Sequence, residues 1–152
     1  MKILGRYTLA VMFVAAVALA SNAALSDHQE PTAAKTKTVK APKAGTLYGA
    51  IVGGLKLIKA GSFDAWIAKY CHPDALCYNA NVKRTLKRYN LKQLKKQAGF
   101  CLAPDGNSLI ITREQKMQGQ EKVFVKCNPK GSPKPFWLKK KGNRWYWTKV
   151  AI

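Results

Sequence analysis

The residues best suited to chemistry are grouped around one proline. His72 and Asp74 flank Pro73, and Tyr70 and Tyr78 are close by in the sequence. A histidine and a carboxylate can act as general acid and base when they reach a bound substrate within hydrogen-bonding distance. A turn, however, explains the Pro-Asp pair without any substrate. We therefore treat Tyr70, His72, Asp74 and Tyr78 as candidate pocket residues and predict no catalytic residue.

Signatures of common catalytic and nucleotide-binding sites are missing from the sequence. It shows no Ser-His-Asp signature, no HExxH zinc motif and no Gly-rich phosphate loop. The pair Gly53-Gly54 is followed by Leu55 and not by the Gly-Lys-Ser/Thr of a phosphate loop. The sequence thus favours a non-catalytic protein and predicts no cofactor and no metal ion.

The chain is strongly basic, with 27 Lys and Arg against seven Asp and Glu and a formal net charge of +20. No acidic residue occurs between Asp74 and Asp105, an interval that holds seven cations. If residues 81–97 form one continuous helix, several of these cations share a stripe along it. After Glu121 the chain has nine more cations and no acid.

Like charges within about 8 to 10 Å add to a common field, which attracts polyanions and releases their counterions. Partners of this kind outside the cytoplasm are an anionic envelope component such as a lipid headgroup, an acidic glycan, or free nucleic acid. The alternative is a solvated charged surface without a partner. The candidate polyanion-binding residues are Lys83, Arg84, Lys87, Arg88, Lys92, Lys95, Lys96, Lys139, Lys140, Lys141 and Arg144.

Aromatic residues are interleaved with the C-terminal cations. Trp137, Trp145 and Trp147 lie in the same segment as Lys139, Lys140, Lys141 and Arg144. Such a mixture suits base stacking combined with phosphate contact. Trp145 and Trp147 nevertheless alternate with polar neighbours as a half-buried strand does, so core positions are predicted for these two.

The N-terminus has the pattern of a cleavable secretory signal peptide, residues 1–23. Lys2 and Arg6 give a positive start, residues 7–20 carry no charge, and small residues follow. The apolar run is shorter than the roughly 20 residues that span a bilayer, so no transmembrane anchor is expected after cleavage. A retained N-terminal anchor is the weaker alternative. The predicted location is the periplasm or the extracellular medium.

Four cysteines fit that location, because an even number in an exported chain favours disulfides. They permit three pairings, of which we favour Cys71 with Cys77 and Cys101 with Cys127, although the sequence alone does not decide. The first bond closes a short turn and the second ties the strand-rich half together. Zinc is the competing interpretation, but the sequence lacks a CxxC pair and a second nearby histidine.

Composition divides the rest of the chain in two. Residues 24–45 contain few large apolar side chains and several Lys and Pro, so they are predicted to form a flexible linker. Residues 46–152 have core-forming character and a length typical of one domain. The oligomeric state stays open.

Periodicity predicts the elements of this domain. Helical spacing of apolar residues indicates helices over 46–60, 63–70 and 81–97, the last broken and recapped at Asn90 and ended by Gly99. A short strand is expected at residues 75–78. Strands over 108–117 and 121–127, a third starting at 136, and a fourth over 144–150 follow, joined by turns. Helices followed by hairpin strands predict an α+β domain with a mainly antiparallel sheet.

This order resembles the nuclear transport factor 2-like superfamily, the cone-shaped fold of ketosteroid isomerases and scytalone dehydratases. The local likeness lies in Ala60-Gly61-Ser62-Phe63-Asp64-Ala65-Trp66, in Tyr70-Cys71-His72-Pro73-Asp74 and in Gly142-Asn143-Arg144-Trp145-Tyr146-Trp147. The resemblance covers about residues 46–152. It implies N-terminal helices packed against a curved sheet that encloses a pocket, and it implies no reaction.

We therefore expect an exported, non-catalytic binding or envelope-associated module of unknown ligand. One alternative is a polyanion-binding protein that uses the basic helix. Another is a pocket enzyme of the isomerase or dehydratase type that uses His72 or Asp74.

Overall fold

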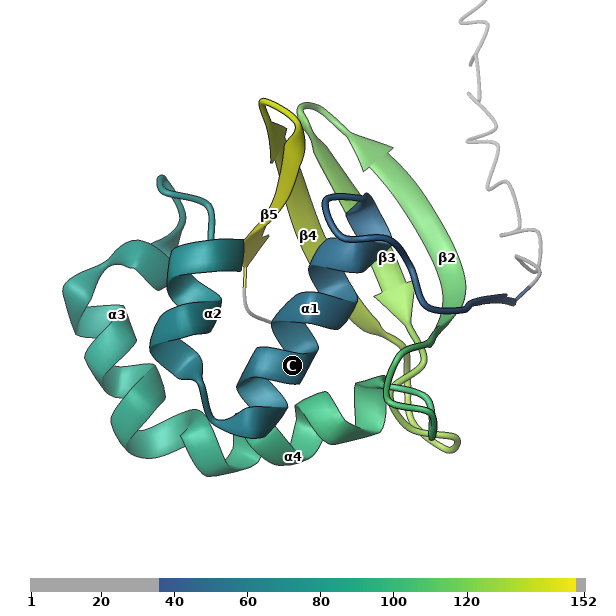
Figure 1. Cartoon of the computed structure of the whole chain (residues 1–152), viewed down its shortest axis with the longest axis horizontal. Helices are drawn as coiled ribbons and strands as arrows, with labels where there is room; N and C mark the ends of the chain where they lie inside the picture. The colour runs from purple at the N-terminus through teal and green to yellow at the C-terminus, as the bar shows by residue number, and fades with distance from the viewer. Residues whose placement is uncertain (1–35, 150–152) are drawn as a thin grey trace, which may run out of the picture. The chain divides into compact units, whose positions relative to one another are not determined.

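The computed structural model describes residues 36–149, all within one compact unit (Figure 1). The predicted signal peptide and the first part of the predicted linker lie outside the described residues. A short strand comes first, the helices follow it, and the other four strands come last. The helical elements are α1 (Leu47–Ala60), α2 (Phe63–Tyr70), the 3-10 helix η1 (Leu76–Tyr78), α3 (Ala80–Thr85), the π-helix η2 (Leu86–Asn90) and α4 (Leu91–Cys101).

The strands form one open antiparallel sheet in the order β1-β2-β3-β4-β5. Their bounds are β1 (Lys37–Val39), β2 (Leu109–Met117), β3 (Gln120–Val125), β4 (Lys134–Lys141) and β5 (Arg144–Lys149). Register shifts occur between Ile111 and Arg113 and between Trp137 and Leu138. Such bulges bend the strands and increase their twist. The predicted α+β class and the four predicted strands are confirmed.

Helix α1 begins and ends as its sequence predicts. The Thr46 hydroxyl accepts a hydrogen bond from the Gly49 amide at 3.1 Å and caps the helix. Gly61 terminates it in the left-handed conformation, with φ of 80°. Between these ends, Ile51, Leu55 and Ile58 are fully buried.

Two adjacent glycines let other elements approach α1 closely. A Cβ added at Gly53 would lie 2.0 Å from the Tyr70 hydroxyl, and one added at Gly54 would lie 2.6 Å from the Trp147 indole. The Trp147 Nε1 donates a hydrogen bond to the Ala50 carbonyl at 3.0 Å. Close packing, and not a bend, therefore explains the Gly-Gly pair in a helix.

The space between helices and sheet is filled by apolar side chains. Figure 1 shows α1 and α2 on one face of the sheet. The Trp66 and Trp147 rings meet edge to face at 5.5 Å, and Phe136 contacts Trp147 at 5.1 Å. Trp147 is buried and Trp145 packs partly buried against the core, as predicted. The largest fully buried side chains are Trp66, Trp147, Phe63, Phe136, Ile51, Leu55, Ile58, Ile67, Leu109, Ile111, Leu138 and Val123.

The basic helix, predicted over residues 81–97, is not broken at Asn90 and does not end at Gly99. Helical structure is continuous from Ala80 to Cys101, and its cap is Asn79, whose side chain accepts hydrogen bonds from the Asn81 and Val82 amides. Asn90 lies inside the helical run and makes no side-chain capping bond. Gly99 does not end α4, because Ala98 and Cys101 are both buried and packing holds the last turn.

Two further predictions are corrected by the fold. Lys37–Val39, assigned to the flexible linker, forms strand β1 and pairs with Leu109–Ile111 of β2. Residues 75–78, expected to form a short strand, instead contain the 3-10 helix η1, which begins inside the loop closed by the Cys71–Cys77 bond. Its turns are closed by hydrogen bonds from the Tyr78 amide to the Ala75 carbonyl and from the Asn79 amide to the Leu76 carbonyl.

Both favoured disulfides are present. Cys71 is bonded to Cys77, and Cys101 at the end of α4 is bonded to Cys127 after β3. The described cysteines therefore hold no zinc through a free thiolate. Of the helices in residues 36–149, none has the length and apolarity that crossing a membrane requires.

Candidate polyanion-binding surface

Positive charge on the described surface is mostly unpaired. Residues 36–149 contain 24 Lys and Arg against five Asp and Glu. Within this range, two lysines lie within ion-pair distance of a described carboxylate: Lys37 beside Glu114 at 2.9 Å and Lys87 beside Asp64 at 2.7 Å. The repulsion left between the other cations is relieved when a polyanion binds.

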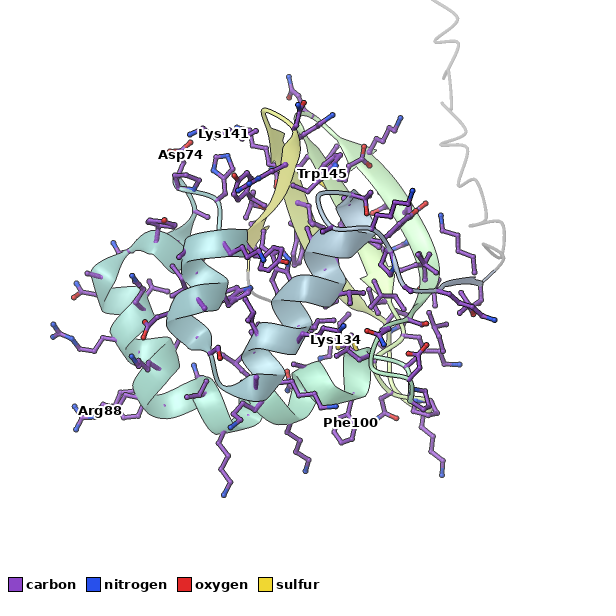
Figure 2. All side chains as sticks on the ribbon, in the orientation of Figure 1. Asp74, Arg88, Phe100, Lys134, Lys141 and Trp145 are labelled. Carbon is purple, nitrogen blue, oxygen red and sulfur yellow. A yellow bond between two sulfur atoms is a disulfide. The ribbon has the colours of Figure 1, made fainter. Side chains whose placement is uncertain are left out.

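The cations of the α3–η2–α4 run do not form a single straight stripe. The π-helical segment Leu86–Asn90 widens one turn, and π-bulges are a known cause of kinks. Figure 1 shows that the run changes direction between α3 and α4. Arg88 projects outward at this bend (Figure 2). The predicted row of Arg84, Arg88 and Lys92 is therefore divided among α3, η2 and α4, on the two sides of the change of direction.

Individual cations of this run also have local partners. The hydrogen bond from Lys87 holds the pKa of Asp64 below its ordinary value. Lys83 lies over the Tyr78 ring at 5.8 Å, Arg88 over Tyr89 at 5.3 Å and Lys96 over Phe100 at 6.0 Å. Aromatic side chains of this helical region are thus exposed beside cations and not folded into the core.

The four predicted hairpin cations form a second group. Lys139, Lys140, Lys141 and Arg144 are exposed, and Lys141 pairs with Arg144 across the β4–β5 turn. Figure 2 shows Lys141 near the top of the molecule and Arg88 at its lower left, well apart from each other. The structure therefore separates the candidate polyanion-binding residues into a helical group and a hairpin group.

A third group of cations, which sequence reasoning missed, lies on the sheet face turned away from the helices. Arg113 of β2 lies over the Phe124 ring of β3 at 4.0 Å. Lys122 lies between Phe124 and Trp137, 4.9 and 5.2 Å from their ring centroids, and Lys149 lies 5.3 Å from Trp137. We call Arg113, Phe124, Lys122, Trp137 and Lys149 the cation–aromatic ladder.

The ladder was partly visible in the sequence. Lys122 and Phe124 are two residues apart in β3, so strand periodicity places them on one face. Their cross-strand neighbours follow from register, which pairs Phe124 with Arg113 and Lys122 with Trp137. Register depends on the turns and on the bulge in β2, and single-strand periodicity contains neither.

The candidate pocket residues are only partly brought together. His72 and Asp74 line a recess of about 270 Å³ beside β5, together with Lys139, Thr148 and Lys149. Tyr78 lies with Asp74 in a shallower neighbouring recess. Tyr70 does not join them, because its hydroxyl packs against Gly53 of α1.

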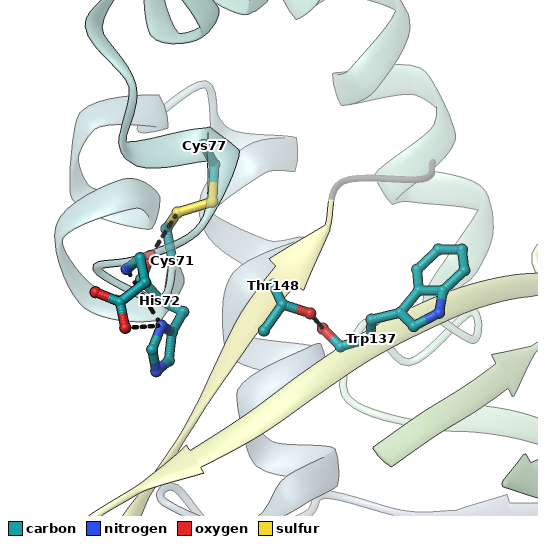
Figure 3. The surroundings of a disulfide bond; sticks show 6 residues. Cys71, His72, Cys77, Trp137 and Thr148 are labelled. Carbon is teal, nitrogen blue, oxygen red and sulfur yellow. Dashed lines mark hydrogen bonds and ion pairs between the residues drawn. A yellow bond between two sulfur atoms is a disulfide. The ribbon is translucent and has the colours of Figure 1, made fainter. Parts of the chain in front are cut away.

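His72 lies beside the Cys71–Cys77 disulfide (Figure 3). It is 3% exposed, its amide donates to the Trp147 carbonyl at 2.8 Å, and its Nδ1 accepts a hydrogen bond from the Asp74 amide at 3.2 Å. Burial lowers the pKa of this imidazole, and the Asp74 carboxylate, 3.6 Å away, only partly opposes that. A neutral imidazole in a turn results, which explains His72 without a substrate.

The described residues offer no preformed metal centre, since nowhere among them do three His, Cys, Asp or Glu side chains cluster to hold an ion. The arrangement can attract anions through exposed Lys and Arg and can stack planar groups on Phe124 and Trp137. Comparison of the chain with known protein families, with curated proteins and with solved structures finds no significant match.

Proposed function

We propose that this chain is an exported, non-catalytic module that binds a polyanion through its surface. The observation that carries the proposal is the imbalance of charge: 24 described cations face five carboxylates, and two of these lysines are ion-paired. The interior between helices and sheet is packed with Trp66, Trp147 and other apolar side chains. Binding at the surface therefore fits the molecule better than catalysis in an enclosed pocket.

The proposed scaffold is the cone-shaped fold of the nuclear transport factor 2-like superfamily. Helices against one face of a bulged antiparallel sheet support this assignment. In that fold the enclosed space commonly forms a ligand pocket, whereas here the same region holds the Trp66–Trp147 pair. A cone filled by its own side chains supports a non-enzymatic member.

Export is the second part of the proposal. The two disulfides fit an oxidising compartment such as the periplasm or the extracellular medium. In either place the available polyanions are headgroups of anionic lipids, acidic glycans and released nucleic acid.

Salt-dependent retention on immobilised heparin tests the proposal. We expect the purified, disulfide-bonded protein to bind, with an affinity that falls steeply as salt rises, because bound cations release counterions. Replacing Arg84, Arg88 and Lys92 together by Glu is expected to abolish retention at physiological salt if the helical group is the working surface.

A matched charge reversal distinguishes the two predicted groups. The triple change Lys139→Glu, Lys141→Glu and Arg144→Glu alters net charge by the same amount in the hairpin group. Equal losses in both variants indicate that net charge alone drives binding, and a larger loss in one identifies the working group. Unchanged retention of both variants would exclude both groups as the working surface, and no retention of the original protein would contradict polyanion binding.

A further inference from the structure

The outer face of the sheet has an uncommon arrangement of side chains. The cation–aromatic ladder crosses four neighbouring strands, from Arg113 on β2 to Lys149 on β5. Cations and rings alternate along it without interruption. Adjacent strands lie about 4.8 Å apart, so the ladder extends over roughly 14 Å.

The two rings of the ladder are not part of the core. Their sequence neighbours Val123, Val125, Phe136 and Leu138 are all buried against the helices. Because side chains alternate along a strand, Phe124 and Trp137 project from the opposite face, where they are half-buried. Cations lie over both rings, with Arg113 at 4.0 Å from the Phe124 centroid and Lys122 and Lys149 at 5.2 and 5.3 Å from that of Trp137.

The acidic residues of the described strands lie on the side of the sheet opposite to the ladder. The two acidic residues of the described strands are Glu114 and Glu121. Glu114 pairs in register with buried Val123, and Glu121 pairs with buried Leu138, so both belong to the helix-facing side. Glu114 is moreover engaged by Lys37 and by the Tyr48 hydroxyl. Asp74, in the loop beside β5, shares a recess with Lys139 and with Lys149 of the ladder.

We propose that the polyanion is a single-stranded nucleic acid and that it binds on the cation–aromatic ladder; this inference rests on the proposed polyanion-binding function. Single-stranded chains are bound by combining a positive surface for the phosphates with aromatic side chains on which bases stack. Phe124 and Trp137 supply two rings for stacking, and Arg113, Lys122 and Lys149, whose cations lie over these rings, supply the charges that meet phosphates.

Other polyanions can contact the cations of this face but do not offer exposed bases to its aromatic rings. A sulfated glycan meets the cations but carries no aromatic bases to stack on the rings. In double-stranded DNA the bases are already stacked within the helix, so its phosphates reach the cations while its base faces do not reach the rings. The ladder therefore fits a flexible chain with exposed bases.

The test compares ligands that share phosphates but differ in bases. Fluorescence anisotropy is measured for the purified, disulfide-bonded protein with an oligothymidylate of about 12 nucleotides, a length within the range single-strand binding modules cover. An abasic oligonucleotide of the same length is the paired probe. We expect the original protein to bind oligothymidylate at least about tenfold more tightly than the abasic chain.

The variant Phe124→Leu with Trp137→Leu removes both rings but keeps apolar side chains in half-buried positions. It is expected to lose about tenfold or more in oligothymidylate affinity, while its binding to the abasic chain and to heparin stays unchanged. The matched control is Tyr89→Leu with Phe100→Leu, which removes two exposed rings beside Arg88 and Lys96 on the helical run. This control is expected to bind oligothymidylate normally. Circular dichroism and thermal unfolding verify that both variants fold.

The outcomes separate this inference from the proposed function. Binding to heparin and to both oligonucleotides with equal affinity, or an unchanged ring variant, overturns the nucleic-acid site and leaves polyanion binding standing. Failure to bind any of these probes overturns both. Tighter, ring-dependent binding to vesicles containing phosphatidylglycerol assigns the face to anionic lipid and also overturns the nucleic-acid site.

Discussion

Among single residues, His72 shows how burial in the fold changes the pKa of a side chain. Its side chain is buried, its Nδ1 accepts the Asp74 amide proton, and its ring meets Tyr146 edge to face at 5.9 Å. Lys139 and Lys141 add a smaller effect in the same direction as burial. The folded state therefore resists protonation of this imidazole, and its pKa lies below that of an exposed histidine.

Stability is expected to fall on mild acidification because of His72. The unfolded chain takes up a proton near its ordinary pKa of about 6.5, whereas the folded chain does so only at lower pH. Between these two pKa values the unfolded state binds more protons, so the free energy of unfolding rises with pH and levels off above about 6.5. Urea denaturation between pH 5 and 7.5 measures this slope.

Two variants test whether His72 causes this dependence of the free energy of unfolding on pH. His72→Asn keeps an acceptor near the position of Nδ1 but does not titrate in this range, so its slope is expected to be flatter. His28→Asn removes the other histidine of the chain and is expected to leave the slope unchanged. An unchanged slope in the His72 variant would show that other groups cause the acid sensitivity. The lowered pKa values of Asp64, Asp105 and Glu114 act at more acidic pH.

Among the elements, the α3–η2–α4 run shows what fixes the ends of a helix. Asn79 caps the first turn through its side chain, whereas Asn90 sits in the helical region with no capping bond. Asn79→Ala is therefore expected to reduce the free energy of unfolding by about 1 kcal/mol. Asn90→Ala is the matched control, expected to change it by less than about 0.5 kcal/mol. Equal effects in chemical denaturation would contradict this assignment of the cap.

Elements with a strong internal signal could be predicted from the sequence. Thr46, the apolar stripe and Gly61 specify α1 locally, and alternation with turn residues specifies the four C-terminal strands. Strand β1 could not be found this way, because Lys37–Val39 is extended only through pairing with β2. Its Lys37 donates to Tyr48 and to Glu114, residues distant in sequence.

The candidate site was predictable to a similar extent. Apart from the half-buried Lys83, the predicted cations of the helix and hairpin are exposed as their composition indicates, and Trp147 is buried as its alternation indicates. The bend at the π-helical turn and the ladder on the outer face depend on long-range packing and register. The spacing of residues along one segment therefore predicts neither the bend nor the ladder.

For the whole molecule, the Cys101–Cys127 bond is the main covalent link between the helical and strand-rich halves. It closes a loop with a sequence separation of 26, against six for Cys71–Cys77. In the chain-entropy description, longer loops give larger stabilisation, about 3.5 kcal/mol for the first and about 2 kcal/mol for the second.

Replacing the cysteines in pairs by Ala tests this difference. Cys101→Ala with Cys127→Ala is expected to destabilise the protein more than Cys71→Ala with Cys77→Ala, by about 1 kcal/mol or more. Denaturant titration of both variants and of the original protein provides the comparison. A larger loss from opening the short loop would mean that local packing of His72 and η1 outweighs the entropy of the long loop.

The Cys71–His72 segment covers the outer edge of the sheet at β5. The His72 amide occupies the Trp147 carbonyl on the free edge of β5, and a parallel bridge joins Cys71 to Trp147. At the opposite edge, β1 is three residues long and begins with a lysine. Exposed sheet edges recruit strands from other chains, and blocked, short or charged edges prevent it. A sheet whose two outer strands are finished in this way is expected to resist edge-to-edge association with other copies of the chain.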